Sequence, residues 1–268
     1  MNVNGRQYHV EVTGQGVPLV LLHGFTGDVS IWQGVRQYFA SSYQVIAVDV
    51  LGHGQSDKPH DVSAYHMTCV ADDICAILDA LSVGRSHLLG YSMGGRLALY
   101  LATQFSDRFY SLILESASPG LATQDERDER RNRDCALADK IEANGILWFV
   151  NFWEKLSLWD SQQQLSGAIL QTQREQRLRN SPHGLANSLR GMGTGVQPSL
   201  WGELTDLSLP TQLIVGEYDT KFLHINQQMS EAIPQVQMTT IPNAGHTVHL
   251  ENFDAFVACV ASFLKATE

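Results

Sequence analysis

A serine lies between two glycines where an apolar run gives way to a helical pattern. The segment "HLLGYSMGGRLALYL" contains Ser92 between Gly90 and Gly94. A sharp strand-to-helix turn at this point forces the serine into strained dihedral angles and accepts only small neighbours. The turn lifts the hydroxyl clear of the sheet, and the amide of Met93 at the helix start is free to stabilise negative charge. The pattern therefore predicts that Ser92 attacks or deprotonates a substrate.

A serine hydroxyl becomes reactive only when a histidine takes its proton. The chain has ten histidines. We favour His246, because "IPNAGHTVHLENF" predicts a strand, a loop containing Gly245 and then the start of a helix. His249 is the alternative, although we expect it one turn into that helix. His23 follows an apolar strand, and we expect it to shape a loop.

An acid that orients the histidine is expected between serine and histidine in chain order, at the end of a strand. Asp219 lies just past the apolar run in "TQLIVGEYD" and is the favoured candidate. Glu217, two residues closer to the strand, and Glu115, at the end of "SLILE", are the alternatives. The chain order Ser92, Asp219, His246 differs from the orders of the chymotrypsin and subtilisin proteases.

Arg96 follows Ser92 by four residues, so on a helix both side chains project to the same side. A guanidinium binds a carboxylate through two parallel hydrogen bonds. Desolvating a cation beside the serine costs free energy, and a neutral substrate would not offset this cost. The spacing therefore indicates an anionic substrate.

Short apolar strands and helical segments alternate along both ends of the chain. We expect a hairpin and then a buried strand within "QYHVEVTGQGVPLVLLHGF", and further strands in "YQVIAVDV", "RSHLLGYS", "YSLILESAS", "PTQLIVG" and "QVQMTTI". Helical periodicity marks "SIWQGVRQYFASS", "VADDICAILDALSV", "MGGRLALYLATQF" and "NFDAFVACVASFLKA". This alternation predicts an α/β fold, with a mostly parallel central sheet and helices on both faces.

The alternation stops between residues 119 and 202, where helical patterns replace strands. "ILWFVNFWEKL" carries an apolar stripe that we expect to pack as one face, formed by Phe149, Phe152, Trp153 and Leu156. An insertion between two strands of such a fold lies over the carboxyl edge of the sheet, where these folds keep their sites. We predict an α/β core from residues 1–118 and 203–268, with residues 119–202 as an inserted helical lid.

Composition excludes several classes of protein. The net charge of −10 argues against a nucleic-acid partner, although residues 119–200 are neutral and arginine outnumbers lysine by thirteen to five. No apolar leader or membrane-length run is present, so we expect a cytoplasmic protein without a membrane span. The four cysteines lack CxxC spacing and are expected to be reduced core thiols. No HxH or HExxH cluster predicts a metal, and no motif predicts a cofactor.

The segments "LVLLHGF", "DVLGHGQSD", "GYSMGG", "VGEYD" and "AGH" together resemble the α/β-hydrolase superfamily. The resemblance covers both ends of the chain and all three candidate triad positions. It implies an oxyanion hole formed by the amides of Phe25 and Met93.

A narrower resemblance lies in "GYSMGGR", "ESASPGL", "ERDERRNRD", "FWEKL", "GTGVQPSLW" and "GEYDTKF". These segments are similar to the menaquinone-pathway synthases of 2-succinyl-6-hydroxy-2,4-cyclohexadiene-1-carboxylate, which are lyases on the hydrolase fold. Methionine at position 93, where other members have leucine, is a conservative departure. The resemblance implies a small substrate with three carboxylates, no metal and no cofactor. It also implies that one pocket is lined by Arg127, by Arg177 (or Arg179 in another alignment) and by Tyr91, Trp153 and Lys221.

Some of these residues have ordinary structural alternatives. Trp153 is equally suited to packing in the lid, and we expect Arg130, Arg131 and Arg133 to be surface charges. Two other functions compete with the lyase: a serine hydrolase of esters or carbon–carbon bonds, and a non-catalytic binding protein, which would need a broken triad.

Overall fold

The computed structural model describes residues 1–267, and its centre is a seven-stranded sheet in the order β3-β5-β4-β6-β7-β8-β9. All neighbouring strands are parallel except β3, which runs antiparallel to β5 at one edge. This arrangement confirms the predicted α/β class. The strands are β3 (Val10–Thr13), β4 (Val17–Leu22), β5 (Tyr43–Val48), β6 (Ser86–Tyr91), β7 (Phe109–Glu115), β8 (Thr211–Gly216) and β9 (Val236–Ile241).

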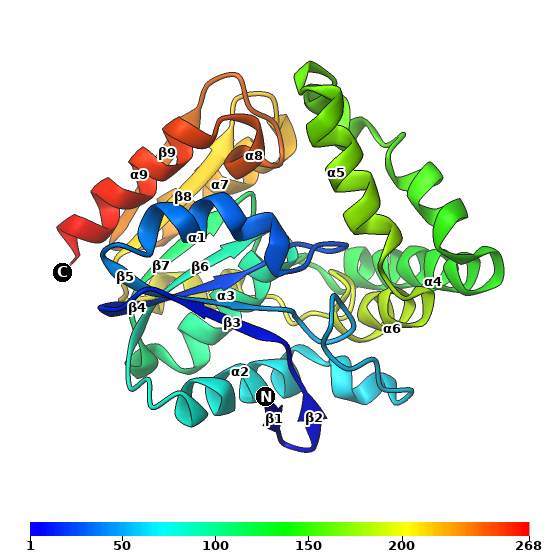
Figure 1. The fold of residues 1–268 in the computed structure, drawn as a ribbon, viewed down its shortest axis with the longest axis horizontal. Helices are drawn as coiled ribbons and strands as arrows, with labels where there is room; N and C mark the ends of the chain where they lie inside the picture. The colour runs from blue at the N-terminus through cyan, green and yellow to red at the C-terminus, as the bar shows by residue number, and fades with distance from the viewer. Residues whose placement is uncertain (268) are drawn as a thin grey trace.

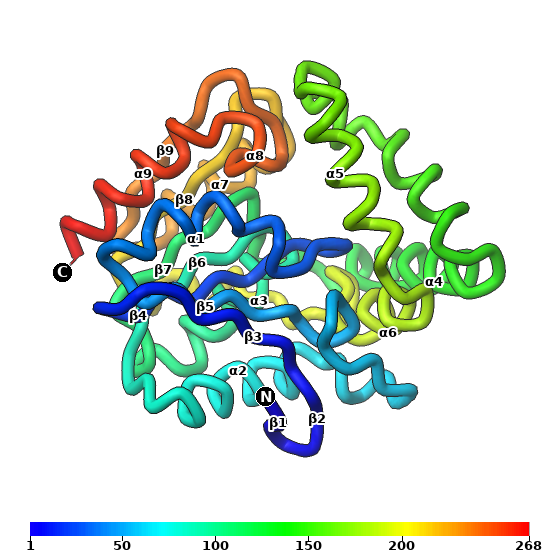
Figure 2. The backbone as a smooth tube through the Cα atoms, in the orientation of Figure 1, coloured from blue at the N-terminus to red at the C-terminus, as the bar shows by residue number. Residues whose placement is uncertain are grey.

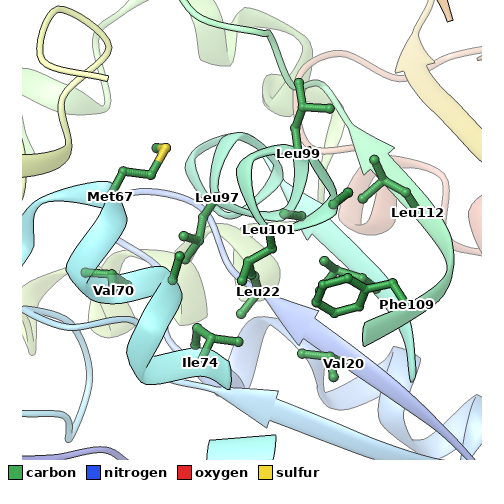
Figure 3. Packing of buried hydrophobic residues seen from close by; sticks show 14 of the residues in the cluster. Val20, Leu22, Met67, Val70, Ile74, Leu97, Leu99, Leu101, Phe109 and Leu112 are labelled. Atoms are coloured by element: carbon green, nitrogen blue, oxygen red, sulfur yellow. The ribbon is translucent and has the colours of Figure 1, made fainter. Parts of the chain in front are cut away.

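Helices cover both faces of the sheet because its central strands are apolar on both sides. In β4, Val20 and Leu22 pack with α2 (Met67–Ala80), α3 (Met93–Gln104) and α7 (Thr220–Ala232), as Figure 3 shows for part of this cluster. Leu19 and Leu21 point to the opposite face and pack with α1 (Gln33–Phe39) and α9 (Phe253–Ala266). Figure 1 shows α1 and α9 in front of the sheet, with α2 below it.

The N-terminal hairpin forms at a different place from the one predicted. β3 and β4 do not pair, because β5 lies between them and pairs parallel with β4 from Val17 to Leu22. A parallel neighbour lets β4 bury both faces, which a solvent-exposed hairpin would not. The hairpin of this region is formed by β1 (Asn2–Val3) and β2 (Arg6–Gln7).

Residues 119–202 form helices on one side of the sheet (Figures 1 and 2). No strand occurs among them, all of which the structure describes. The helices are α4 (Gln124–Trp153), the 3-10 helix η4 (Ser157–Gln164), α5 (Gly167–Leu178) and α6 (Pro182–Met192). α4 consists of two helical parts joined at Gly145, whose φ of 77° interrupts the helix. These helices have a small apolar cluster of their own, which includes Phe149 and Leu185.

Three expectations for side chains and helices need correction. α6 was not predicted, although Ser181 caps its N-terminus and Pro182 occupies the first turn, which are both helix-start signals. Phe152 does not belong to a buried stripe, since it is 40% exposed and stacks on Trp148. Only Cys75 of the four free cysteines is buried. In residues 1–267, no helix is long and apolar enough to cross a membrane.

Candidate active site

Ser92 occupies the turn between β6 and α3 with φ 50° and ψ −106°, a conformation that costs a non-glycine residue free energy. The two flanking glycines make the turn possible. A Cβ at Gly90 would lie 2.3 Å from the carbonyl oxygen of Gly94, and a Cβ at Gly94 would lie 2.2 Å from that of Leu22. The elbow therefore depends on close backbone approach at both positions, as the sequence motif predicted.

Ser92, His246 and Asp219 form a continuous hydrogen-bonded chain. Ser92 Oγ lies 2.9 Å from His246 Nε2, and His246 Nδ1 lies 2.6 Å from Asp219 Oδ2. Asp219 comes three residues after β8 and precedes α7, whereas His246 lies on the loop after β9. Because an ionised Asp219 only accepts hydrogen bonds, it fixes the Nδ1–H tautomer and leaves Nε2 able to take the serine proton.

One carboxylate holds the His246 loop from both sides. Glu251 accepts hydrogen bonds from the amides of Gly245 at 2.8 Å and Thr247 at 3.0 Å, which flank His246 in the chain. Sequence reasoning missed this residue. Its position in α8 (Val248–Glu251), directly after the loop, was the available signal.

The rejected triad candidates have other partners. Glu115 at the end of β7 is fully buried and accepts from Nδ1 of His249 at 2.7 Å and from its backbone amide at 3.0 Å. Glu217 accepts from the amide of Asn243 at 3.0 Å. His23 shapes its loop, since its Nε2 accepts from the amide of Val50 at 2.9 Å.

The loop after β4 approaches the elbow closely. A Cβ at Gly24 would lie 3.5 Å from the Cβ of Ser92 and 2.6 Å from the ring of Tyr91. Phe25 follows Gly24, and its amide makes no hydrogen bond within the described part of the chain. Met93 is the first residue of α3, where backbone amides have no intrahelical acceptor. Both candidate oxyanion donors therefore come from segments beside Ser92.

A cavity of about 360 Å³ lies beside the elbow. Two of its lining residues are chain neighbours of triad candidates, since Tyr91 precedes Ser92 and Thr247 follows His246. A third, Phe25, is a candidate oxyanion donor. The hydroxyl groups of Tyr91 and Thr247 are 2.8 Å apart. Burial raises the pKa of Tyr91 well above its ordinary value, so its phenol stays protonated.

Arg177 lines this cavity, and Arg179 does not. Arg177 is 8% exposed, its Nη1 lies 3.4 Å from Glu154, and its guanidinium lies over the ring of Trp159. Burial lowers the pKa of Arg177, which the Glu154 carboxylate partly opposes. Arg179 points to the surface and lies 3.4 Å from Asp28. Of the two alignments, the geometry favours the one that uses Arg177.

Arg96 lies one turn after Ser92, and its amide donates to the Ser92 carbonyl at 3.0 Å. Its Nη1 donates to the Met192 carbonyl at 3.0 Å and to Oε1 of Gln197 at 2.6 Å. Gln197 is 1% exposed, so this contact is shielded from water. Burial lowers the pKa of Arg96 to about 10, and the Arg130 guanidinium acts in the same direction. Arg96 therefore remains charged at neutral pH, with one nitrogen held in place.

Arg127 does not line the cavity that Arg177 lines. It lies in the first turn of α4 and donates to Oε1 of Gln124 at 2.7 Å and to the carbonyl of Leu121 at 3.3 Å. It lines a separate hollow that also includes Arg131 and Gln197. Gln197 is thus the link between Arg96 and Arg127. It lies in the "GTGVQPSLW" segment, which sequence analysis singled out without assigning this residue a role.

Trp153 and Lys221 lie outside the cavity lining. Trp153 packs against Phe25 at 5.5 Å between ring centroids, which suits lid packing over the oxyanion loop. Lys221 is exposed, and its ammonium lies 5.3 Å from the ring of Phe222, which packs on His246. Partial desolvation lowers the pKa of Lys221, and the charge of Arg130 lowers it further. Within residues 1–267, no group of three or more His, Cys, Asp or Glu side chains is placed to hold a metal ion.

Comparison with known proteins gives consistent matches over nearly the whole chain. The profile of the alpha/beta hydrolase fold family matches residues 17–253. A Bacillus subtilis (strain 168) protein with the provisional name 2-succinyl-6-hydroxy-2,4-cyclohexadiene-1-carboxylate synthase is 44% identical, over 92% of this chain and 90% of its own. The synthase of that name from Citrobacter koseri is 31% identical, over 92% of this chain and 93% of its own.

Solved structures agree with these relatives. MenH from S. aureus superposes with a TM-score of 0.92 at 38% identity, covering 97% of this chain and 98% of its own. A thermophilic esterase from Thermogutta terrifontis, solved with malate bound, gives a TM-score of 0.87 at 26% identity, covering 98% of this chain and 94% of its own.

Proposed function

The chain belongs to the α/β-hydrolase-fold family and within it to the 2-succinyl-6-hydroxy-2,4-cyclohexadiene-1-carboxylate synthases, and from this we propose roles for its residues. The enzyme eliminates pyruvate from 2-succinyl-5-enolpyruvyl-6-hydroxy-3-cyclohexene-1-carboxylate in menaquinone biosynthesis. We propose that Ser92, His246 and Asp219 carry out the proton abstraction. The observation that carries this proposal is the hydrogen-bonded chain of 2.9 and 2.6 Å between them.

The names of substrate and product define the bonds that change. A 3-ene becomes a 2,4-diene, so the proton leaves ring carbon C2, which carries the succinyl ketone, and the enolpyruvyl oxygen leaves C5. The C2–H electrons form the C2–C3 double bond, the old double bond moves to C4–C5, and the C5–O bond breaks. Ser92 Oγ takes the proton as its own passes to His246 Nε2, and Asp219 stabilises the resulting imidazolium. The departing oxygen keeps the C5–O electrons as the enolate of pyruvate. Return of one proton from the Ser92–His246 pair to the methylene carbon of this enolate gives pyruvate and restores the resting enzyme.

Negative charge develops on the oxygen of the succinyl ketone when the C2 proton is removed. We assign its stabilisation to the amides of Phe25 and Met93, which flank Ser92 from two segments. The three carboxylates of the substrate require fixed cations, and we assign them to Arg96, Arg127 and Arg177. Tyr91, Trp153 and Lys221 complete the proposed binding site at its edges.

We further propose that residues 119–202 act as a lid. Their helices carry Arg127 and Arg177, and α5 forms one wall of the cavity. The lid contacts the triad loop directly, because Gln162 donates to Thr247 at 3.0 Å, next to His246. Such a lid must move to admit substrate. We also propose a cytoplasmic location, in line with the four free cysteines.

A product assay tests the reaction. The protein is given the enolpyruvyl substrate without added metal or nucleotide, pyruvate is followed by coupling to lactate dehydrogenase, and the diene is followed by near-ultraviolet absorbance. We expect one pyruvate per diene, and Ser92→Ala should abolish both signals together. Rapid cleavage of neutral aryl esters with the enolpyruvyl substrate left intact would instead support a hydrolase, the activity of the esterase neighbour.

A further inference from the structure

A second cavity, of about 290 Å³, lies within the lid and shares Arg177 with the cavity beside the elbow. All of its lining residues belong to the segment 154–177 of the lid. Two of them, Glu154 and Arg174, are charged and do not line the cavity beside the elbow. The proposed reaction gives these two residues no role, although both lie close to an arginine that it does use.

Glu154 directly follows α4, and two arginines of α5 share its carboxylate unequally. Its Oε2 accepts a hydrogen bond from Arg174 Nη1, whereas its Oε1 lies 3.4 Å from Arg177 Nη1. Charge-assisted hydrogen bonds between nitrogen and oxygen are usually shorter, roughly 2.7–2.9 Å. Arg174 is itself fixed by a second contact, because its Nη2 donates to Oδ1 of Asn151 at 2.6 Å. The carboxylate is therefore held mainly by Arg174.

Arg177 keeps most of its hydrogen-bonding capacity. A guanidinium has five N–H donors, and the contact with Glu154 is the only hydrogen bond of the Arg177 side chain within residues 1–267. The ring of Trp159, 5.1 Å from the Arg177 guanidinium, supports it without using a donor. Burial lowers the pKa of Arg177, the Glu154 carboxylate opposes this effect, and the Arg174 charge adds to it. The charges of all three side chains therefore act on one another.

Resting on the proposed function, we propose that Arg174 is a positioning residue, which holds Glu154 and so leaves Arg177 available to a carboxylate of the substrate. Without Arg174, both oxygens of Glu154 could turn to Arg177 in the two-point geometry that a guanidinium and a carboxylate favour. A substrate carboxylate would then have to displace Glu154. Since Arg174 does not line the cavity beside the elbow, it acts through Glu154 and Arg177 and not on the substrate itself.

The first test measures binding of the enolpyruvyl substrate to Arg174→Gln. Calorimetry in the Ser92→Ala background excludes turnover. Because the substitution releases Glu154, affinity should fall about threefold to tenfold, the value of one hydrogen bond. In the otherwise unchanged enzyme KM should rise by the same factor, with little change in kcat or Tm. Arg174→Lys keeps a charge beside Glu154 and should show a smaller loss.

A double variant separates this role from simple structural support. Glu154→Gln combined with Arg174→Gln removes the competing carboxylate together with the residue that holds it, so affinity should return to within about twofold of the parent. If Arg174 only supported the lid, the double variant would lose further contacts and bind no better than Arg174→Gln. Failure of the double variant to recover affinity would therefore overturn the proposal.

Arg179→Gln is the matched control. It removes the same charge at the end of the same helix, but Arg179 contacts Asp28 and not Glu154, and it does not line the cavity. It should bind the substrate as the parent does. An equal loss of affinity in Arg179→Gln would show that net charge alone matters, and unchanged affinity in Arg174→Gln would equally overturn the proposal. If Arg174→Gln does not fold, Glu154→Gln decides: it should bind up to about threefold more tightly, and weaker binding would contradict us.

The outcomes for the reaction and for Arg174 are separate. If Arg174→Gln weakens binding and the double variant recovers it, but the parent releases no pyruvate from the substrate, the proposed reaction fails while the role of Arg174 stands. If the parent releases pyruvate but affinity and KM are unchanged in Arg174→Gln, the reaction stands and the role of Arg174 fails.

Discussion

Two acid–histidine pairs lie at the carboxyl edge of the sheet, and their histidines are three residues apart in the chain. The distance between carboxylate and ring nitrogen is nearly the same in both pairs. His246 Nδ1 lies 2.6 Å from Asp219, and His249 Nδ1 lies 2.7 Å from Glu115. All four side chains are buried. They differ in the partner of the second ring nitrogen: Nε2 of His246 meets the hydroxyl of Ser92, whereas that of His249 makes no hydrogen bond within residues 1–267.

With His246 as the proposed base, a carboxylate partner does not by itself identify a catalytic base. The partner fixes the tautomer and the ring, and the group on the opposite side of the ring determines the chemistry. His246 lies on a loop whose position Glu251 sets, so its ring can turn toward the elbow. His249 lies inside α8, and its backbone amide is also bound by Glu115, so its ring is held against β7.

The largest expected effect separates the two histidines directly. His246→Ala should lower kcat by about 10⁴-fold or more, because no other group can take the Ser92 proton. His249→Ala should leave kcat within about tenfold and act mainly on KM. Steady-state pyruvate release measures both. A larger loss of kcat in His249→Ala, with Tm preserved, would reverse the assignment of the base.

Substitutions of the two carboxylates, Asp219 and Glu115, test the same difference between the pairs. Asp219→Asn should lower kcat by about 10²- to 10⁴-fold with a small change in Tm, because asparagine fits the site but favours the wrong tautomer of His246. Glu115→Gln should change kcat much less than Asp219→Asn does. It should lower the free energy of unfolding by about 1–3 kcal/mol, because two buried hydrogen bonds lose their charged acceptor. Thermal unfolding and pyruvate release together give the comparison. Equal effects on kcat would mean that both pairs take part in proton transfer.

The sequence was sufficient to predict that Ser92, Asp219 and His246 meet, but not the arrangement around them. The elbow motif, the apolar strands and the chain order locate Ser92, Asp219 and His246 because each follows a strand end, and parallel strands end at one edge. The partners of Arg96 and Arg127 come from the 119–202 region, where helix packing and not strand order sets neighbours. No local pattern indicates that Gln197 reaches Arg96, 101 residues away in the chain.

Strand pairing in the sheet was also not predictable from the sequence alone. β3 and β4 are separated by three residues, which favours a hairpin, yet the strand inserted between them comes from Tyr43–Val48. The apolar character of β4 on both faces indicates burial but does not say which strand provides it. Tertiary pairing therefore overrode the local turn signal.

Arg127 tests the side of the site that lies away from His249. Arg127→Ala should raise KM and lower kcat/KM by about tenfold to a hundredfold, the contribution of one charge-assisted hydrogen bond to a carboxylate. Tm should change little, because the side chain is only partly buried and bonds to nearby groups of its own turn. Unchanged KM with a collapsed Tm would show that Arg127 is structural.

The smallest expected effect concerns Gln197, which holds Arg96 without any charge of its own. Gln197→Met keeps the volume and removes the acceptor, while the Met192 carbonyl still binds the same Nη1 atom. KM should therefore rise about threefold to tenfold, the value of one hydrogen bond, with kcat nearly unchanged. Gln212→Met is the control, because Gln212 is equally buried but hydrogen-bonds Thr239 within the sheet.

Gln197→Glu completes this test, because it keeps the acceptor but adds a charge. A carboxylate there would pair with Arg96 and offset the cation that the substrate needs, so KM should rise more than in Gln197→Met. If Gln197→Glu leaves KM as it is in the parent, Arg96 does not hold a carboxylate of the substrate.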